Sequence, residues 1–548
     1  MRAWLDETHG PTFELLRHFL LRFFDSELVT SPGQTVLALI GSSTMFLVWF
    51  PFFAGPIQDK YKHLSSLASP EPYRLALRAD HLWLITMLMS AIGLLTAIKW
   101  QSLFPSLTDY RAIGWMPVRA RQVFGAKLAA LLIVATGAIA VLDLLPCMGF
   151  PALSGGRWAF HQSIGSQAVA LLAAVVAASY FVLFALITVQ GVILNLFRRS
   201  IQGLLAATML IGLVLSFSIG PSTVRWATST PVAIWLPPVW FLGLCQAMSG
   251  DPDPTMQAMA HRAATALTAA VVFALAAYTV TYRRHKALTL EGIKAARRER
   301  PWYGTVFDWL VPDPRRQAVM TFLAKGILGN GPHRMILMGY GGFGLAILLG
   351  SMIGVPGTPA RFVYAHVILL IFLLIGLRHL FSIPVELKAN WAFRMTEGEG
   401  RKEWRSAIDA FVLFFGALGG AIPFPFEAHL LGWQAVSESV LFVVFCLAAY
   451  EAVFASWEKL PFTCSYLPGK QPIWMVALKL FALLAALPVV SAILLACLDN
   501  WLLYAATFAV LLAIWVRSSR ARREHWAESR LLYDDTPDPA IHSLNLLR

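Results

Sequence analysis

The sequence predicts an all-α polytopic membrane protein, with about twelve transmembrane helices arranged as two fused six-helix bundles. Hydrophobic residues make up 57% of the 548-residue chain and charged residues only 14%, which is too little charge to cover a soluble protein of this length. Twelve apolar runs are each roughly 18–25 residues long, enough to cross about 30 Å of hydrocarbon. The second six repeat landmarks of the first about 280–300 residues later, as an internal duplication would produce.

The predicted spans are the long apolar runs of the chain. They lie near residues 35–57, 79–100, 126–149, 166–196, 202–222, 261–283, 333–354, 362–385, 405–425, 433–456, 472–494 and 498–516. Apolar and charged residues alternate at helical spacing ahead of each bundle, which predicts amphipathic interfacial helices over 11–30 and 315–328. The first half is then residues 1–300, the second half 301–525, and the tail 526–548.

One segment of the first half has no counterpart in the second. Residues 229–250 are apolar, but Pro231, Pro237 and Pro238 interrupt them. A broken run of this kind does not span a bilayer, so we expect short helices that lie in the outer interface or dip back into it.

Lysine and arginine positions predict the topology. With twelve spans, the basic clusters fall on one side, which places loops 101–125 and 386–404 and both termini in the cytoplasm of a multi-pass protein of the bacterial inner membrane. The segment 58–79 disagrees, because Lys60, Lys62, Arg74 and Arg78 lie on the outer side. The net charge of +13 is explained by this asymmetry and by attraction to anionic membrane lipid, so no nucleic-acid partner is expected. No cleavable signal peptide is expected either, since acidic residues precede the first apolar run.

Loop landmarks, as well as helices, carry the duplication. Pro32 and Pro332 each follow an amphipathic segment, at an offset of 300 residues, and Arg121 and Arg401 align at an offset of 280 in the loop after the second span of each half. Six spans per half give both halves the same orientation. Parallel repeats are typical of transporters, both exporters and ion-coupled carriers.

The loop before the third span has the most specific local sequence. Residues Met116–Lys127 read MPVRARQVFGAK. This segment resembles the loop that leads into the third helix of ATP-binding-cassette exporter permeases of the second type. The resemblance implies a six-helix permease core, an N-terminal interfacial helix, short outer helices before the last span, and a separate cytoplasmic ATP-binding subunit, in two copies, docked on the cytoplasmic loops. The second half departs from the motif at residues 395–401.

Aromatic and arginine side chains in these loops are the candidate ATPase-docking residues, because such residues are enriched at interface hot spots. Ordinary positive-inside residues and interfacial aromatics are the alternative interpretation. The candidates are Arg111, Trp115, Pro117, Arg119, Arg121, Phe124, Lys388, Trp391, Arg394 and Arg401.

The chain carries no motif for catalysis of its own. It has no GxxxxGK[ST] loop, so ATP hydrolysis would reside on a separate subunit, and it has neither an HExxH nor a GxSxG motif. The five cysteines form no CxxC pair, so no metal site or redox motif is indicated and no cofactor is expected. We therefore predict a transport subunit rather than an enzyme. Because the chain carries both bundles, one chain is compatible with a complete permease.

Few ionisable residues fall within the predicted spans, and these are the candidate intramembrane polar groups. Asp143 and Glu451 are the carboxylates that an ion-coupled carrier, the main alternative to an exporter, would use. His366 has no Asn or Asp beside it, as a membrane acyltransferase would need, and a lone membrane histidine is typical of a helix-packing donor. The scarcity of charge favours a hydrophobic or amphiphilic substrate.

Overall fold

The computed structural model is helical throughout almost all of its described residues, and it confirms the predicted all-α polytopic fold. Among these residues, eight helices are long and apolar enough to cross a membrane. The structure describes residues 12–21, 55–98, 103, 120–155, 158, 163–196, 212, 234–290, 311, 313–352, 359–385, 390–455, 457, 459–464, 473–528 and 532.

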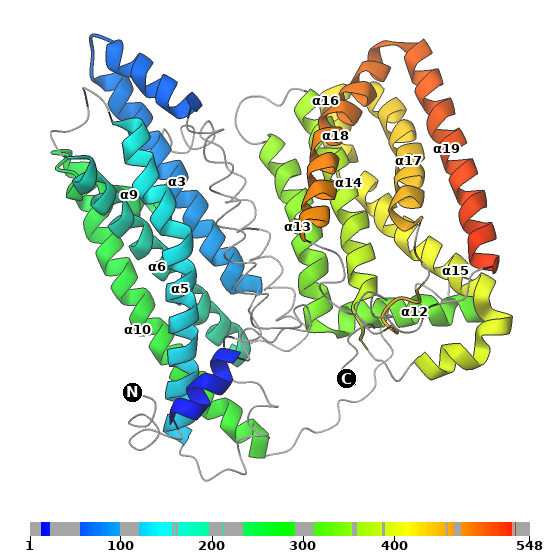
Figure 1. Ribbon diagram of the computed structural model, residues 1–548, viewed down its shortest axis with the longest axis horizontal. Helices are drawn as coiled ribbons and strands as arrows, with labels where there is room; N and C mark the ends of the chain where they lie inside the picture. Colours follow the sequence, from blue (N-terminus) through cyan, green and yellow to red (C-terminus); the bar gives the residue numbers. More distant parts are fainter. Residues whose placement is uncertain are drawn as a thin grey trace, which may run out of the picture. The chain divides into compact units, whose positions relative to one another are not determined.

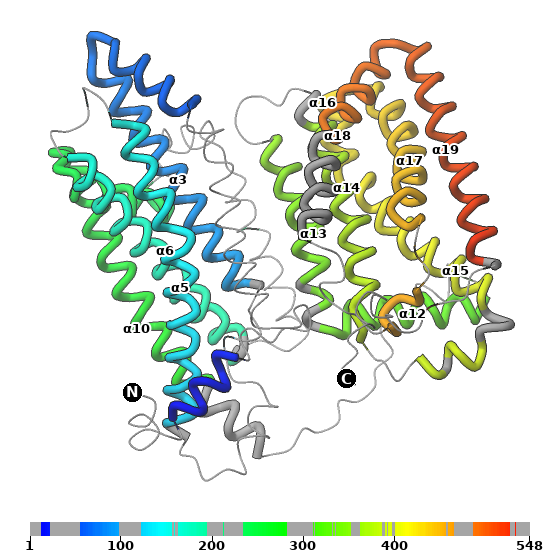
Figure 2. Tube along the Cα trace, viewed as in Figure 1, coloured from blue at the N-terminus to red at the C-terminus, as the bar shows by residue number. Residues whose placement is uncertain are grey.

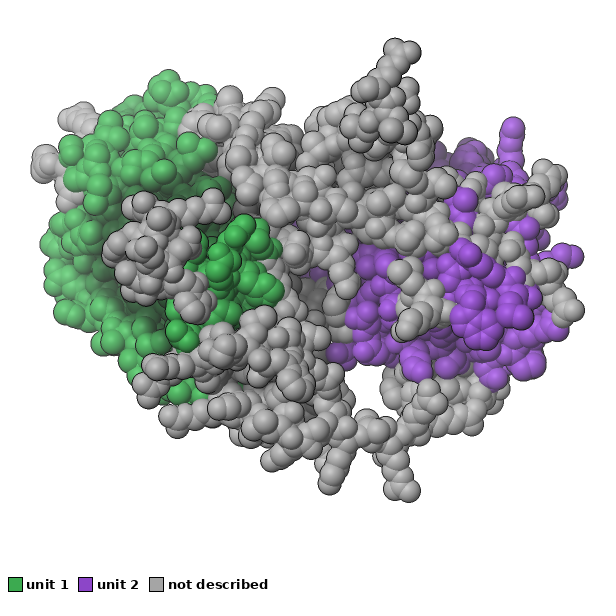
Figure 3. Space-filling view, turned by 60° about the horizontal axis from the view of Figure 1, so that its bottom comes forward, with its two compact units in different colours: residues 1–296 green, residues 297–548 purple. Residues whose placement is uncertain are grey.

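Two compact units make up the chain, residues 1–296 and 297–548, and their boundary lies close to the predicted one at residue 300 (Figure 3). The described helices of the first unit are a short helix at 12–21, a second at 55–66, α3 (Glu71–Ile98), α5 (Ala120–Ser154), α6 (Ile164–Leu196), α9 (Pro237–Met248) and α10 (Pro254–Leu290) (Figure 1).

The first described helix of the second unit, α12 (Pro314–Gly329), lies across one end of this unit, and the long helices run at a steep angle to it (Figures 1 and 2). Its other described helices are α13 (Gly331–Met352), α14 (Pro359–Ser382), α15 (Asn390–Ala421), α16 (Phe424–Leu431), α17 (Gln434–Phe454), α18 (Ile473–Asp499) and α19 (Trp501–Glu528). Asp313 begins α12, because its side chain accepts a hydrogen bond from the Arg315 amide at 3.0 Å.

Most predicted spans coincide with these helices. The spans near 35–57 and 202–222 lie largely outside the described residues, and each of the others falls on a helix. Residues 390–404 of the predicted connection 386–404 are helical, because α15 begins at Asn390 and also includes most of the ninth predicted span. Strong helix formers, namely three glutamates, two arginines, Ala392, Met395 and Lys402, make up 8 of the 15 residues from 390 to 404.

The proline-broken outer segment does contain a short helix, α9. It begins at Pro237, where the missing amide hydrogen of proline costs nothing, and its inward face buries Phe241, Leu242 and Cys245. A Cβ at Gly243 would lie only 2.4 Å from the Cβ of Met259, so glycine is needed for α9 to pack this closely on α10.

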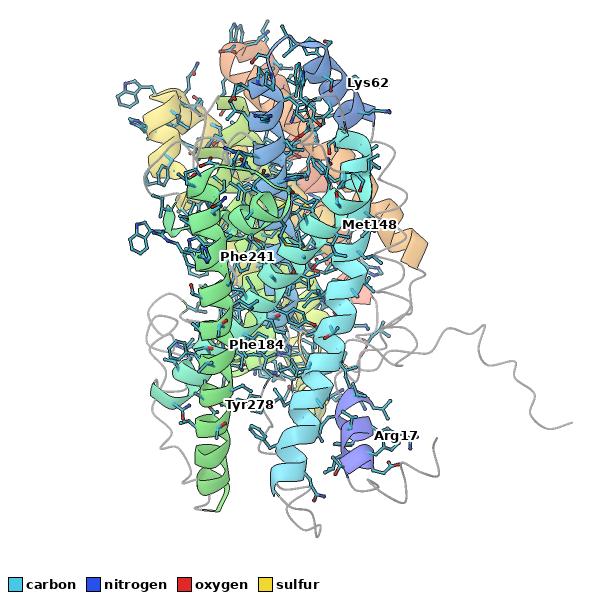
Figure 4. The ribbon with its side chains drawn as sticks, turned by 90° about the vertical axis from the view of Figure 1, so that its left-hand side faces the viewer. Arg17, Lys62, Met148, Phe184, Phe241 and Tyr278 are labelled. Carbon is cyan, nitrogen blue, oxygen red and sulfur yellow. The ribbon has the colours of Figure 1, made fainter. Side chains whose placement is uncertain are left out.

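Two cations of the segment 58–79, Lys60 and Arg78, form ion pairs with acidic residues of the same unit. Lys60 lies 2.6 Å from Asp80, and burial raises the pKa of Tyr61, whose hydroxyl stays protonated and donates to the same carboxylate at 2.8 Å. Figure 4 places Lys62 of this segment at the end of the first unit opposite to Arg17 of the helix 12–21. The charges of Lys60 and Arg78 therefore do not argue against a location of this segment on the outer side.

Arg78 joins α3 to the turn between α9 and α10. Its guanidinium lies 2.5 Å from Asp251, which is 4% exposed, and 3.3 Å from Asp253. Hydrogen bonds from Thr255, with a smaller contribution from Arg78, lower the pKa of Asp253. The contact fixes one end of the short helix α9.

Replacing Arg78 by Met is expected to destabilise the first unit by about 1–2 kcal/mol, because it leaves the buried Asp251 carboxylate without a cation, while the partial exposure of Arg78 keeps the cost below that of a fully buried pair. Reversible unfolding of the detergent-solubilised protein measures the change. Lys62→Met, on the exposed side of the helix 55–66, is the control. Equal stabilities of the two variants would contradict this role for Arg78.

Candidate functional site

In the first unit, the amphipathic helix at 12–21 packs on the beginning of α5. Leu15 and Phe19 form a small buried core with Val123, Ala126 and Ala130. The Lys127 ammonium lies 5.0 Å from the centre of the Phe19 ring, which adds a cation–π contact. The helix 12–21 is therefore attached to the segment of α5 that directly follows the predicted docking loop.

In the second unit, α12 packs in the same way on the beginning of α15. The Phe322 ring of α12 meets Phe393 of α15 edge to face, with ring centres 5.4 Å apart, and Phe393 meets Trp404 at 5.3 Å. Leu323 and Trp404 belong to the buried core of this unit. Edge-to-face aromatic pairs contribute about 0.5–1.5 kcal/mol each beyond their buried area, so this joint is stiff.

The short segment 459–464, which follows α17, packs against α12 and α14. Phe462 is fully buried, and its amide donates to the Phe381 carbonyl at 3.1 Å while its own carbonyl accepts from the Val385 amide at 3.0 Å. Its φ of 66° is unusual for a bulky residue, so the surrounding contacts must hold it in place. Gly326 of α12 leaves room for it, since a Cβ there would lie 2.8 Å from the Phe462 ring.

The predicted docking residues divide into three groups. Phe124 packs edge to face on Tyr278 of α10, with ring centres 4.9 Å apart, so its ring contacts a neighbouring helix of its own unit. Trp391, which is 64% exposed, and Arg394 lie on the solvent-facing side of α15, while Arg401 is half-buried. Arg111, Trp115, Pro117, Arg119 and Lys388 lie outside the described residues, and Arg121 is described only as a helical position of α5.

The candidate carboxylate of the first unit, Asp143, is fully buried in α5. Ser179 of α6 donates a hydrogen bond to it at 2.8 Å. The contact joins two neighbouring helices.

Glu451 takes part in a salt-bridge network, which the sequence did not indicate. Its carboxylate accepts two hydrogen bonds from Arg522 of α19, at 2.5 and 3.1 Å. The same guanidinium reaches Asp409 of α15 at 3.1 Å and the Tyr450 hydroxyl at 3.0 Å, and Tyr450 donates to Asp409. Arg405 lies 3.5 Å from Asp409. The network ties α15, α17 and α19 together, and both cations have acidic partners.

His366 lies in a buried cluster with two glutamates, which the sequence did not indicate. Its Nδ1 contacts the carboxylate of Glu427 and lies 3.5 Å from Glu438. Its Nε2 lies 3.1 Å from the Gly419 carbonyl oxygen, which can only accept, so Nε2 carries a proton. The ring stacks on Phe442 with centres 3.7 Å apart. We call His366, Glu427 and Glu438 the histidine–glutamate cluster.

Sequence reasoning missed both glutamates for different reasons. Glu427 lies in α16, an eight-residue helix within a stretch predicted as a connection, and Glu438 lies in the first turns of α17, where a charge near a span end is unremarkable. Because the two glutamates lie on different helices, helical periodicity does not place them on one face, even though 11 residues is close to three turns. The available signal was a pair of acidic residues, one in the connection before the tenth span and one near the start of that span.

An apolar cavity of about 360 Å³ adjoins the cluster, between α14, α15, α16 and α17. Gly416 and Gly420 of α15 and Phe442, Val443 and Cys446 of α17 form much of its lining, and His366 is part of the wall. The two glycines lie on one face of α15 and allow α17 to pack closely, since a Cβ at Gly416 would lie only 2.5 Å from the Cys446 sulfur.

No protein-family model matches the chain, and no curated protein or solved structure is significantly similar to it. The resemblance of residues 116–127 to exporter permeases therefore stays a prediction.

Proposed function

We propose that the chain is the membrane-spanning permease of an ATP-binding-cassette exporter, driven by a separate cytoplasmic ATPase that binds in two copies. One observation carries the proposal. In both units, an amphipathic lead-in helix packs through a buried apolar joint on the beginning of the third helix, where the docking segment meets it. A motor outside the membrane can move a span only through such a rigid connection.

The second unit supplies a docking surface of suitable chemistry. Trp391, Arg394 and Met395 are exposed on the first turns of α15, on the segment that Phe393 and Trp404 attach to α12. Tryptophan and arginine are both among the residues enriched in interface hot spots. Binding energy delivered there reaches the membrane-spanning part of α15 through the same helix, which bends between Phe393 and Trp404, because these residues are 11 apart and their rings lie only 5.3 Å from each other.

An ion-coupled carrier is the second candidate, and the histidine–glutamate cluster is the observation that favours it, because buried ionisable groups are typical of coupled carriers. The pairing of Glu451 with Arg522 argues against Glu451 as the coupling group. The apolar lining of the cavity beside the cluster fits a hydrophobic or amphiphilic substrate in either case.

Charge reversal in the first docking segment tests the exporter proposal. Arg119→Glu combined with Arg121→Glu is expected to weaken ATPase binding about 30-fold or more, since one hot-spot residue contributes about 2 kcal/mol. Co-purification of the ATPase with the tagged chain measures binding, and ATP hydrolysis of the complex measures coupling. The matched control reverses Arg520 and Arg523, which are exposed on α19 of the second unit. Full co-purification of the ATPase with the first double variant would contradict docking through this loop.

A further inference from the structure

The histidine–glutamate cluster converges from three separate helices of the second unit. His366 comes from α14, Glu427 from α16 and Glu438 from α17, and the exposed fraction of each is at most 2%. One ligand atom from each residue lies within 4.8 Å of those of the other two. Three chain segments thus bring together the nitrogen and oxygen donors that metal ions bind.

The carboxylates of the histidine–glutamate cluster are neither fully hydrogen-bonded nor balanced in charge by the described residues around them. No hydroxyl, amide, lysine or arginine among the described residues donates a hydrogen bond to the four carboxylate oxygens of Glu427 and Glu438. Buried carboxylates are costly unless they are paired, hydrogen-bonded or bound to a metal. A single imidazole facing two carboxylates leaves an excess of negative charge, which a divalent cation would remove.

His366 is oriented as a metal ligand would be. Its Nε2–H donates to the Gly419 carbonyl, so Nδ1 is the ring nitrogen that faces the glutamates, and it becomes a metal ligand once the proton that it shares with Glu427 leaves. A hydrogen bond from the second ring nitrogen to a carbonyl is the usual support of a metal-binding histidine. Stacking on Phe442 holds the plane of the ring.

We propose that His366, Glu427 and Glu438 bind one divalent first-row transition-metal ion such as Zn²⁺ or Mn²⁺. Imidazole with carboxylates suits these ions, and two carboxylates balance the charge of one ion. Metal–ligand bonds of about 2.0–2.2 Å place the donors of a tetrahedral site about 3.3–3.6 Å apart. The 3.5 Å between His366 Nδ1 and Glu438 already fits this spacing, while Glu427, which contacts Nδ1, would have to rotate slightly away from it. Three protein ligands leave a coordination position open, and the adjoining cavity has room for a water or a substrate oxygen there.

The ion would attach the short helix α16 to α14 and α17. Without it, the eight residues of α16 hold their position mainly through packing on α17, and most side chains of α16 are exposed. Metal binding therefore predicts a measurable gain in stability of the folded protein, because an ion that binds only the folded state stabilises it by mass action.

Metal titration of the full-length protein tests the proposal. The protein is purified in detergent, treated with EDTA, desalted, and incubated with Zn²⁺, Mn²⁺ or Co²⁺, and bound metal is counted by mass spectrometry. About one ion per chain is expected, with Co²⁺ giving visible d–d absorption bands. His366→Ala and Glu438→Gln are each expected to weaken binding by about tenfold or more. His429→Ala is the matched control, because His429 is exposed on α16 two residues after Glu427.

The shift of the unfolding temperature on adding Zn²⁺ is a second measurement, and it is informative even if one variant is less stable. Zn²⁺ is expected to raise the unfolding temperature of the wild-type protein and of His429→Ala, and to leave that of Glu438→Gln unchanged. In EDTA, Glu438→Gln should be at least as stable as the wild type, because it removes an unbalanced buried charge. Binding of less than about a tenth of an equivalent of each ion, equal binding to all variants, or loss of binding only in His429→Ala would overturn the proposal.

Discussion

Replacing Arg522 by Met is expected to destabilise the second unit by about 3–5 kcal/mol, which is the usual cost of removing one partner of a buried ion pair. Arg522 is 6% exposed and holds Glu451 by two hydrogen bonds and Asp409 by one. Its removal leaves two carboxylates without their principal cation. Reversible unfolding in mixed detergent micelles measures the loss.

Arg523→Met is the matched control for this prediction, because Arg523 is the next residue of α19 and is exposed. A double variant, Arg522→Met with Glu451→Gln, is expected to recover part of the lost stability, since it removes the stranded charge along with its partner. Arg522→Met that unfolds together with Arg523→Met would contradict the account of this network. Recovery in the double variant would also show that Glu451 has a structural role.

Two tryptophans of α15 are expected to respond in opposite ways to replacement by alanine. Trp404 is buried against Phe393, so Trp404→Ala should cost about 3–5 kcal/mol of stability. Trp391 is exposed, so Trp391→Ala should change stability by less than about 0.5 kcal/mol. If Trp391 docks the ATPase, its loss weakens binding by about 2 kcal/mol, or about 30-fold.

Unfolding titrations and ATPase binding measured on the same two variants separate folding from docking. ATPase binding to Trp391→Ala at wild-type strength would remove this residue from the docking surface. A stable Trp404→Ala protein would contradict the aromatic joint between α12 and α15.

The helices were predictable because a bilayer imposes a simple rule on sequence. Each described span is a long apolar run. α10 extends beyond the predicted span 261–283 at both ends, where the sequence is more polar, and α14 begins and ends about three residues before the predicted span 362–385. The lead-in helices were also predictable, because apolar and charged residues alternate at helical spacing in the segments that contain Phe19 and Phe322. The start of α15 at Asn390 was not predictable from hydropathy, because a stretch with many charged residues has the same low hydropathy whether it is a helix or a loop.

The polar sites could not be predicted, because they depend on which helices become neighbours. In the sequence, Glu451 has no basic residue near it within its span. Its partner Arg522 is 71 residues further along, among the basic residues that follow the last span. His366 lies 61 residues before Glu427 (427 minus 366). No periodicity connects such distant residues. The basic residues of segment 58–79 posed the same difficulty, because Asp251, the partner of Arg78, lies 173 residues away.

The mass of the native complex tests the central proposal most directly. The tagged chain is purified from the membranes of its own cell in mild detergent and weighed by native mass spectrometry, with its partners identified by sequencing. The account predicts one chain with two copies of a protein that carries a GxxxxGK[ST] loop, and vanadate-sensitive ATP hydrolysis by the complex. A chain that purifies without a nucleotide-binding subunit, and that moves substrate in proteoliposomes under an imposed ion gradient without ATP, would contradict it.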